Sequence, residues 1–143
     1  MQFNFFKRSD EKGGSESARS ASTAKKILLC EDDPFYAEAI RVLLSRNGYA
    51  VEVALDGVQA LAVLGGQTFD LILCAVQLPV HDGFAILKSV RLDARLKRTP
   101  FIFLTAVADS ATMDRATEEG ATDYFIKASA GLSHLLELIK KYV

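Results

Sequence analysis

Short apolar runs alternate with helical patterns five times between Lys25 and Val143. The apolar runs are too continuous for strands that keep one face in water, and such runs are typical of a parallel sheet buried on both sides. Parallel strands need a crossover between them, and that crossover is usually a helix. The alternation therefore predicts a doubly wound α/β fold, with a five-stranded parallel sheet and helices on both faces.

Capping and turn residues set the expected boundaries of these elements. Asp33 and Pro34 are typical of a helix start, Gly48 of a helix end, and the glycine pair 65–66 is expected to close the second helix. The expected strands are 25–30, 49–55, a run that ends at Ala75, 101–104 and 123–126, and the expected helices are 34–47, 57–64, 84–94, 109–119 and 132–139. The helix over 109–119 carries only a thin apolar stripe, which predicts weak burial and a mobile element.

Composition excludes several classes of protein. With 143 residues, half of them hydrophobic, the chain has the size of one domain and can bury a core. A formal net charge of -1 and a pI near 6.1 give no sign of a DNA-binding surface. No run approaches the roughly 18 apolar residues of a membrane span. We therefore expect a cytoplasmic protein.

The first 24 residues differ from the rest of the chain. They are rich in glycine, serine and alanine and show no periodicity, which predicts a disordered tail over 1–24 and a folded domain over 25–143. The aromatic cluster of Phe3, Phe5 and Phe6 stops at Lys7 and Arg8, so it is too short for a secretory signal. Two interpretations stay open: a plain solvated end, or a handle that docks to a partner or touches an anionic membrane.

Polar residues gather at the expected strand ends. In an open α/β sheet the carboxyl ends of neighbouring strands meet at one crevice, where ligands bind. These ends supply Glu31 and Asp32, Ala75, Thr105 and Lys127. Adjacent carboxylates repel each other unless a hard cation offsets their charge, and Mg²⁺ takes one or two protein carboxylates while it keeps several waters. A hydroxyl and an ammonium group suit phosphoryl oxygens.

From Lys25 to the end, these motifs resemble the response-regulator receiver domain. In that family a hydrophobic strand leads to a phospho-accepting aspartate, then two residues, then Met-Pro or Leu-Pro, and Leu78–Pro79 fits this pattern. The resemblance implies a flavodoxin-like receiver fold with strand order 2-1-3-4-5. It also implies roles for particular residues: Glu31 and Asp32 as the metal-binding acidic pair, the Gln77 backbone carbonyl as a further ligand, Thr105 as the switch hydroxyl, Lys127 as the phosphate-pairing lysine and Tyr124 as the switch aromatic.

Two positions depart from the family. Counting back from Leu78–Pro79 puts Ala75 at the aspartate position, and a methyl group cannot form an aspartyl phosphate. The sequence leaves two origins open for Ala75, a natural pseudo-receiver or an engineered replacement of aspartate. The second departure is Ala128, where the family usually has a proline, often after a cis bond. A non-proline cis bond costs ~3 kcal/mol, so we expect a trans bond and a differently shaped loop.

The resemblance implies a signalling function rather than an enzyme. We expect a stand-alone receiver domain of a two-component phosphorelay that acts through protein–protein contacts and is not phosphorylated at the family's position. Expected partners are a histidine kinase or another signalling protein, and a downstream protein at the face of the fourth helix, fifth strand and fifth helix. Mg²⁺ should bind weakly without a carboxylate at position 75. The alternative is a Mg²⁺-dependent phosphohydrolase on a related fold, but segment 31–35 lacks the aspartate pattern that such an enzyme needs.

Several residues also have plain structural interpretations. Asp33 is expected to be a helix cap, Asp82–Gly83 a turn, and His81 and His134 surface residues. Tyr124 has two open interpretations, a switch residue or simple packing. For Cys30 and Cys74, which end or adjoin the ends of neighbouring strands, we favour two small buried hydrophobic residues over a disulfide.

Overall fold

The computed structural model describes residues 23–106 and 109–143. The disordered tail predicted over 1–24 lies outside the described residues, apart from its last two positions. The aromatic cluster of Phe3, Phe5 and Phe6 lies outside them as well, so its proposed docking role stays a prediction.

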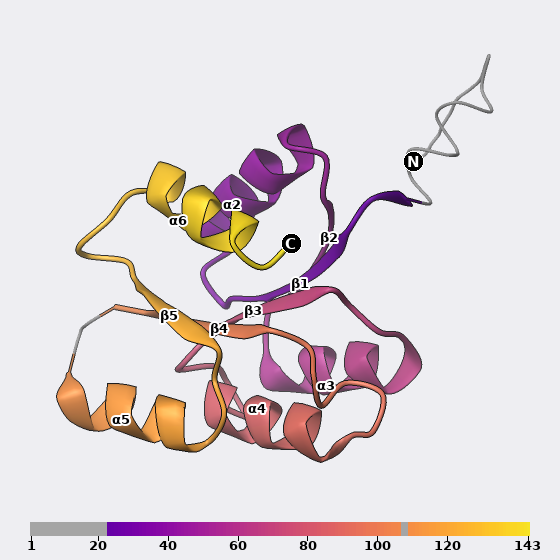
Figure 1. Ribbon diagram of the computed structural model, residues 1–143, viewed down its shortest axis with the longest axis vertical. Coiled ribbons are helices and arrows are strands. Elements are labelled where there is room, and N and C mark those ends of the chain that lie inside the picture. Colours follow the sequence, from indigo (N-terminus) through magenta and orange to yellow (C-terminus); the bar gives the residue numbers. More distant parts are fainter. Residues whose placement is uncertain (1–22, 107–108) are drawn as a thin grey trace.

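Five parallel strands form a single sheet in the order β2-β1-β3-β4-β5, as predicted (Figure 1). The strands are β1 (Lys26–Cys30), β2 (Ala50–Ala54), β3 (Leu71–Ala75), β4 (Phe101–Thr105) and β5 (Asp123–Ile126). Every residue of β3 and β4 is buried, while the edge strands β2 and β5 are partly exposed. The continuous apolar runs of the sequence therefore mark the centre of the sheet.

Helices cover both faces of the sheet. They are α2 (Pro34–Arg46), α3 (Gly57–Gly66), α4 (Gly83–Leu92), α5 (Ser110–Glu118) and α6 (Leu132–Lys140). Figure 1 shows α2 and α6 together on one face, and α3, α4 and α5 on the other. The doubly wound α/β fold is thus confirmed.

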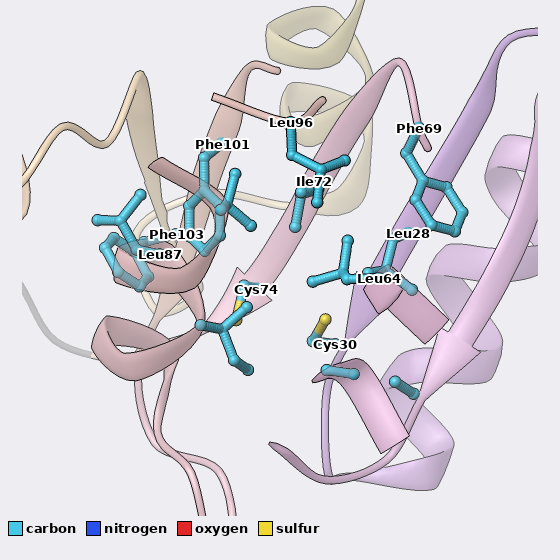
Figure 2. Close-up of a cluster of buried hydrophobic side chains, with 14 of the residues drawn as sticks. Leu28, Cys30, Leu64, Phe69, Ile72, Cys74, Leu87, Leu96, Phe101 and Phe103 are labelled. Carbon is cyan, nitrogen blue, oxygen red and sulfur yellow. The ribbon is translucent and has the colours of Figure 1, made fainter. Parts of the chain in front are cut away.

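Alternate residues of the strands pack in two separate hydrophobic cores, because successive side chains of a strand point to opposite faces of the sheet. In β1, Leu28 and Cys30 pack towards α3 and α4, while Ile27 and Leu29 pack towards α2 and α6. Figure 2 shows the first core, which includes the edge-to-face rings of Phe101 and Phe103. β3 contributes residues to both cores, so packing on both faces of the sheet holds its carboxyl end in place.

Aspartate side chains cap the N-termini of helices that follow the strands. Asp33 accepts hydrogen bonds from the backbone N–H groups of Phe35 (3.0 Å) and Tyr36 (3.3 Å), which confirms the predicted cap. Asp82 accepts from the N–H of Ala85 (2.9 Å) and caps α4. The turn predicted for Asp82–Gly83 was therefore wrong: Gly83 is already the first helical residue, because the aspartate satisfies an N–H group that a helix start leaves unpaired.

The end of α3 also differs from the sequence prediction. Gly65 and Gly66 do not close this helix but are its last two residues, and Gln67 follows as the C-cap. A glycine closes a helix when it takes a positive φ, as Gly48 does after α2 with φ 91°. Neither Gly65 nor Gly66 has a positive φ, so the chain leaves α3 in an extended conformation at Gln67.

Other predictions are confirmed by the described residues. His81 and His134 are exposed. Cys30 and Cys74 are both fully buried and form no disulfide, although they sit directly opposite each other in the β1–β3 register. No cis peptide bond occurs in the two described ranges, as expected for the loop at Ala128.

Candidate functional site

The carboxyl ends of the central strands surround a cavity of about 250 Å³. Its lining is drawn from four β–α loops or strand ends: Asp32, Ala75, Val76, Gln77, Leu104, Thr105, Ala106, Asp109, Thr112 and Lys127. Five of the residues singled out from the sequence meet here: Asp32, Ala75, Gln77, Thr105 and Lys127. Glu31 lies beside the cavity rather than in its lining. Tyr124 is half-buried in the middle of β5, where it packs against the core under α3 and α4 and does not line the cavity.

Glu31 is a buried carboxylate with two partners. Only 1% of the residue is exposed. Its Oε1 accepts a hydrogen bond from the Lys127 ammonium group at 2.7 Å, and its Oε2 accepts from the backbone N–H of Asp33 at 3.0 Å. A buried charge is stable only when it is paired and hydrogen-bonded, and Glu31 meets both conditions.

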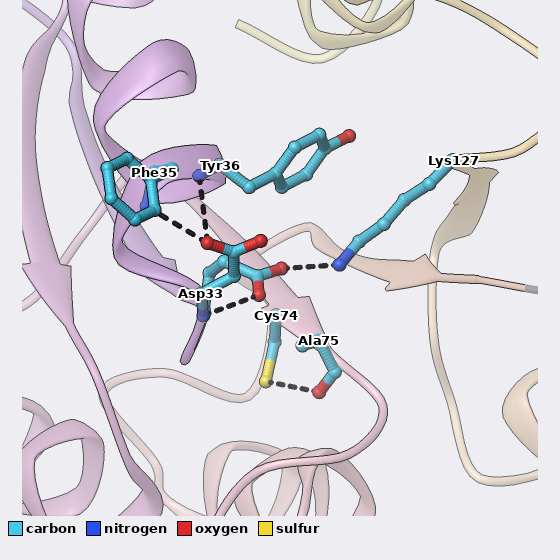
Figure 3. A network of polar contacts seen from close by, with 7 residues as sticks. Asp33, Phe35, Tyr36, Cys74, Ala75 and Lys127 are labelled. Carbon is cyan, nitrogen blue, oxygen red and sulfur yellow. Dashed lines mark hydrogen bonds and ion pairs between the residues drawn. The ribbon is translucent and has the colours of Figure 1, made fainter.

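Lys127 is held from a second side by an aromatic ring. Its Nζ lies 4.6 Å from the centroid of Tyr36, in the range of a cation–π contact. Figure 3 shows the lysine reaching from the end of β5 towards the base of α2, with the tyrosine ring beside it. Burial, and secondly the negative charge of Glu31, raise the pKa of Tyr36. The tyrosine is therefore neutral at physiological pH, and its ring face is available to the ammonium group.

Ala75 occupies the end of β3, between the two cores. It is 4% exposed, and its carbonyl oxygen accepts a weak hydrogen bond from the thiol of Cys74 at 3.3 Å. Burial, together with the hydrogen bond and charge interaction with Cys30, raises the pKa of the Cys74 thiol well above its ordinary value. A buried thiol of this kind is inert, since the thiolate is the nucleophile. No nucleophilic side chain is supplied at this strand end by Ala75 or by Cys74.

Gly83 has a structural role at the site that sequence reasoning missed. A Cβ atom there would lie 2.3 Å from the carbonyl oxygen of Ala75 and 2.8 Å from the ring of Phe103. The N–H of Gly83 donates to the carbonyl of Val76 at 2.8 Å. The start of α4 is thus pressed directly against the end of β3. Sequence signals point to a turn at Asp82–Gly83, and they contain nothing that reports this close approach.

The start of α5 was also missed as part of the site. Asp109 and Thr112 both line the cavity. Oδ1 of Asp109 accepts from the N–H of Thr112 at 3.0 Å, and Oδ2 accepts from its hydroxyl at 2.6 Å. These hydrogen bonds lower the pKa of Asp109, so the carboxylate stays charged at neutral pH. The helix start had been predicted at Asp109, and its closeness to Thr105 follows only from the packing of the loops.

The groups that could hold a metal ion at the cavity are few. Across residues 23–106 and 109–143, no three carboxylate, imidazole or thiol side chains gather in a way that could hold a metal ion. Both oxygens of Glu31 already accept hydrogen bonds, which leaves Asp32 and Gln77 at the cavity wall. Mg²⁺ usually binds one or two protein carboxylates and keeps several waters, so these two residues could hold the ion with water as the remaining ligands. In the same described ranges, no helix combines the length and the apolar character that a membrane crossing requires.

Comparison with known sequences identifies the family. A family model for the response regulator receiver domain matches residues 27–140. The chain is 36% identical over 118 residues to the transcriptional regulatory protein CrdR of Helicobacter pylori, which covers 82% of this chain and 54% of that protein. It is 31% identical over 115 residues to the regulator of RpoS of Escherichia coli, covering 80% and 34%. The chain thus spans between a third and about half of the length of these relatives.

Solved structures agree with the sequence comparison. The chemotaxis response regulator CheY4 of Vibrio cholerae superposes with a TM-score of 0.79 at 30% identity, covering 85% of this chain and all of CheY4. The receiver domain of the sensor histidine kinase PA1611 of Pseudomonas aeruginosa, solved with a magnesium ion coordinated in its active site cleft, gives a TM-score of 0.76 at 31% identity, covering 84% and 98%. The strand order, the polar residues at the strand ends and these matches agree, and the chain belongs to the response regulator receiver domain family.

Proposed function

We propose that this chain is a receiver domain that accepts no phosphate at the family's position and signals through protein–protein contacts. The observation that carries the proposal is Ala75. This residue lines the cavity at the end of β3, with two residues between it and Leu78–Pro79, and Thr105 and Lys127 line the same cavity. Phosphoryl transfer to this position requires a carboxylate nucleophile, which alanine lacks.

A weakened interaction with Mg²⁺ is part of this proposal. Receiver domains bind Mg²⁺ in the active site, as the PA1611 domain does. In this chain Glu31, Asp32 and the backbone carbonyl of Gln77 are the proposed ligands, and Glu31 is at the same time bound to Lys127. The loss of one carboxylate at position 75 and the engagement of a second both support weaker binding than in the relatives.

The proposed partners are signalling proteins. Receiver relatives are named as regulators of transcription and chemotaxis, which supports a histidine kinase or another signalling protein as the input and a downstream protein as the output. We propose the face of α5, β5 and α6 as the output surface, with Thr105 and Tyr124 as switch residues. These relatives give no support to the alternative of a phosphohydrolase. Two unbridged buried thiols are consistent with a reducing, cytoplasmic location.

Intact-mass measurement tests the proposal directly. The full chain is incubated with Mg²⁺ and acetyl phosphate, and we expect no phosphoryl adduct. The matched control is Ala75→Asp, which restores the carboxylate and is expected to gain a Mg²⁺-dependent, hydroxylamine-labile adduct. An acyl phosphate on the parent chain would contradict the proposal. A control variant that gains no adduct would show that Thr105, Lys127 and the acidic residues no longer form a competent site.

A further inference from the structure

A second and larger hollow lies between α4 and α5, outside the cavity of the candidate site. It has a volume of about 540 Å³, and its lining includes Phe84, Lys88, Arg91, Leu92, Arg115 and Glu119. The hollow exists because α5 packs poorly: Ala116 is the one buried residue of this helix, all of whose residues are described. A single small side chain cannot bring α5 close to α4. We call this hollow the α4–α5 groove.

One wall of the α4–α5 groove is an apolar stripe on α4. Phe84, Lys88 and Leu92 follow one another at intervals of four residues, so they lie on the same side of the helix. Leu92 is 76% exposed, one of the most exposed large hydrophobic residues in the described chain. The ring of Phe84 is covered on the groove side by the guanidinium group of Arg115, 3.9 Å from the ring centroid. Phe84 is only 5% exposed, so the exposed apolar surface of this stripe is that of Leu92.

The charges around this stripe are unbalanced. No carboxylate among the described residues pairs with Lys88. The guanidinium group of Arg91 bonds to backbone carbonyl oxygens, those of Thr99 at 2.7 Å and Gly120 at 2.9 Å, so its positive charge is not neutralised by an acid. Glu119 is already bound to Arg115 at 2.7 Å. Asp82 also lines the groove and caps α4. Three cationic side chains therefore stand beside two carboxylates, and the groove is locally positive although the whole chain carries a net charge of -1.

We propose that the α4–α5 groove binds a short acidic segment of a partner protein. An apolar side chain of this segment packs on Leu92, and flanking carboxylates face Lys88 and Arg91. Burial of an exposed leucine supplies affinity, and opposite charges supply orientation and specificity. A nucleic acid backbone fits less well, because it matches the positive charges but offers nothing apolar to Leu92.

Both helices that form the groove, α4 and α5, begin at the candidate site. The first residue of α4, Gly83, is pressed against the carbonyl of Ala75. The cap of α5, Asp109, lines the site cavity. A partner that fills the groove therefore contacts two helices whose first residues form part of the site, without any need for a phosphoryl group. The inference goes beyond the proposed function, and it stands whether or not Ala75 prevents phosphorylation.

Selection from a random peptide library displayed on phage tests the proposal on the full chain. We expect the enriched peptides to be acidic and to carry at least one large apolar residue. For a synthetic copy of the best peptide, Lys88→Glu and Leu92→Ser should each weaken binding by about tenfold. Lys140→Glu, an exposed charge reversal on α6, is the matched control and should leave binding unchanged. A copy of the peptide with lysine in place of its acidic residues should recover affinity for Lys88→Glu.

Three outcomes would overturn the proposal. The first is an absence of enriched peptides, or enrichment of basic ones. The second is equal affinity of the best peptide for the parent, Lys88→Glu and Leu92→Ser. The third is a dimer in sedimentation experiments that Leu92→Ser abolishes, which would assign the groove to a second copy of this chain. Both Lys88 and Leu92 are exposed, so neither substitution is expected to unfold the protein, and circular dichroism melts provide that check.

Discussion

The ends of β1 and β3 lie next to each other in the sheet and are built in opposite ways. Cys30 and Cys74 face each other across the two strands, and the residues that follow them are Glu31 and Ala75. Glu31 is a buried charge held by an ammonium group and a backbone N–H. Ala75 is a small residue whose backbone carbonyl lies close against Gly83 at the start of α4. The end of β1 depends on charge pairing, and the end of β3 depends on close packing that leaves no space for an added side chain. Different substitutions should therefore destabilise the two strand ends.

Lys127→Met is expected to have the largest effect, because it leaves the buried Glu31 carboxylate without its cationic partner. Removing one member of a buried ion pair typically costs 3–5 kcal/mol, and the 26% exposure of the Lys127 side chain places the expected loss near the lower end, about 3 kcal/mol. Urea unfolding measures the change. Lys140→Met, an exposed lysine on α6, is the control and should change the free energy of unfolding by less than about 0.5 kcal/mol.

A small effect of Lys127→Met would show that Glu31 does not rely on Lys127. In that case the contrast between the two strand ends would be wrong, since neither would depend on charge pairing. Glu31→Gln sharpens the result, because it keeps the side-chain volume and removes the charge. With Glu31→Gln in place, the further substitution Lys127→Met should cost much less than it does alone.

The substitution Gly83→Ala tests the close packing at the end of β3. The added Cβ meets a backbone carbonyl and a packed ring, neither of which can move easily, and overpacking of this kind costs about 1–3 kcal/mol. We expect a loss of about 2 kcal/mol in the free energy of unfolding. Gly65→Ala, at a helical position with open space around it, is the matched control and should be neutral or stabilising. Equal effects of the two substitutions would show that α4 can move away from Ala75.

Asp109→Ala probes the cap of α5, an exposed carboxylate, in contrast to the buried Glu31. Loss of the helix cap should lower the free energy of unfolding. The folded pKa of Asp109 is lowered by Thr112, so its contribution is present above the ordinary pKa of 3.8 and is lost as the pH falls through the folded value. The parent and Asp109→Ala should therefore converge in stability below that pH, as acid-titrated melts would show. A difference that persists in acid would contradict the assigned cap.

Much of the fold and part of the site were predictable from sequence. Continuous apolar runs predicted the buried strands, and the convergence of strand ends predicted that Asp32, Thr105 and Lys127 meet at one cavity. The rest depends on distances that sequence patterns do not encode. Periodicity places Tyr36 on α2, but the contact of its ring with Lys127 depends on where the start of α2 lies relative to the end of β5. In the same way, an Asp-Gly pair suits both a turn and a capped helix, and only the approach of Gly83 to Ala75 distinguishes them.

Val80→Gly is expected to have the smallest effect, and it sharpens the picture of a tightly built β3 end. Val80 has a φ of 71°, the one positive φ of a non-glycine residue among those described, and its neighbours form a tight turn in which the N–H of His81 donates to the carbonyl of Pro79 at 2.9 Å. A β-branched residue in this conformation is strained by about 1–3 kcal/mol, and glycine removes the strain while it adds about 1 kcal/mol of chain entropy to the unfolded state. Val80 is 77% exposed, so little burial is lost.

We expect a net gain of about 0.5 kcal/mol in the free energy of unfolding of Val80→Gly, seen as a higher urea midpoint at an unchanged slope. Val80→Ala keeps the Cβ and should gain less than glycine. If both variants lose stability, the loop after β3 is not strained, and the close packing at Ala75 and Gly83 carries this strand end alone.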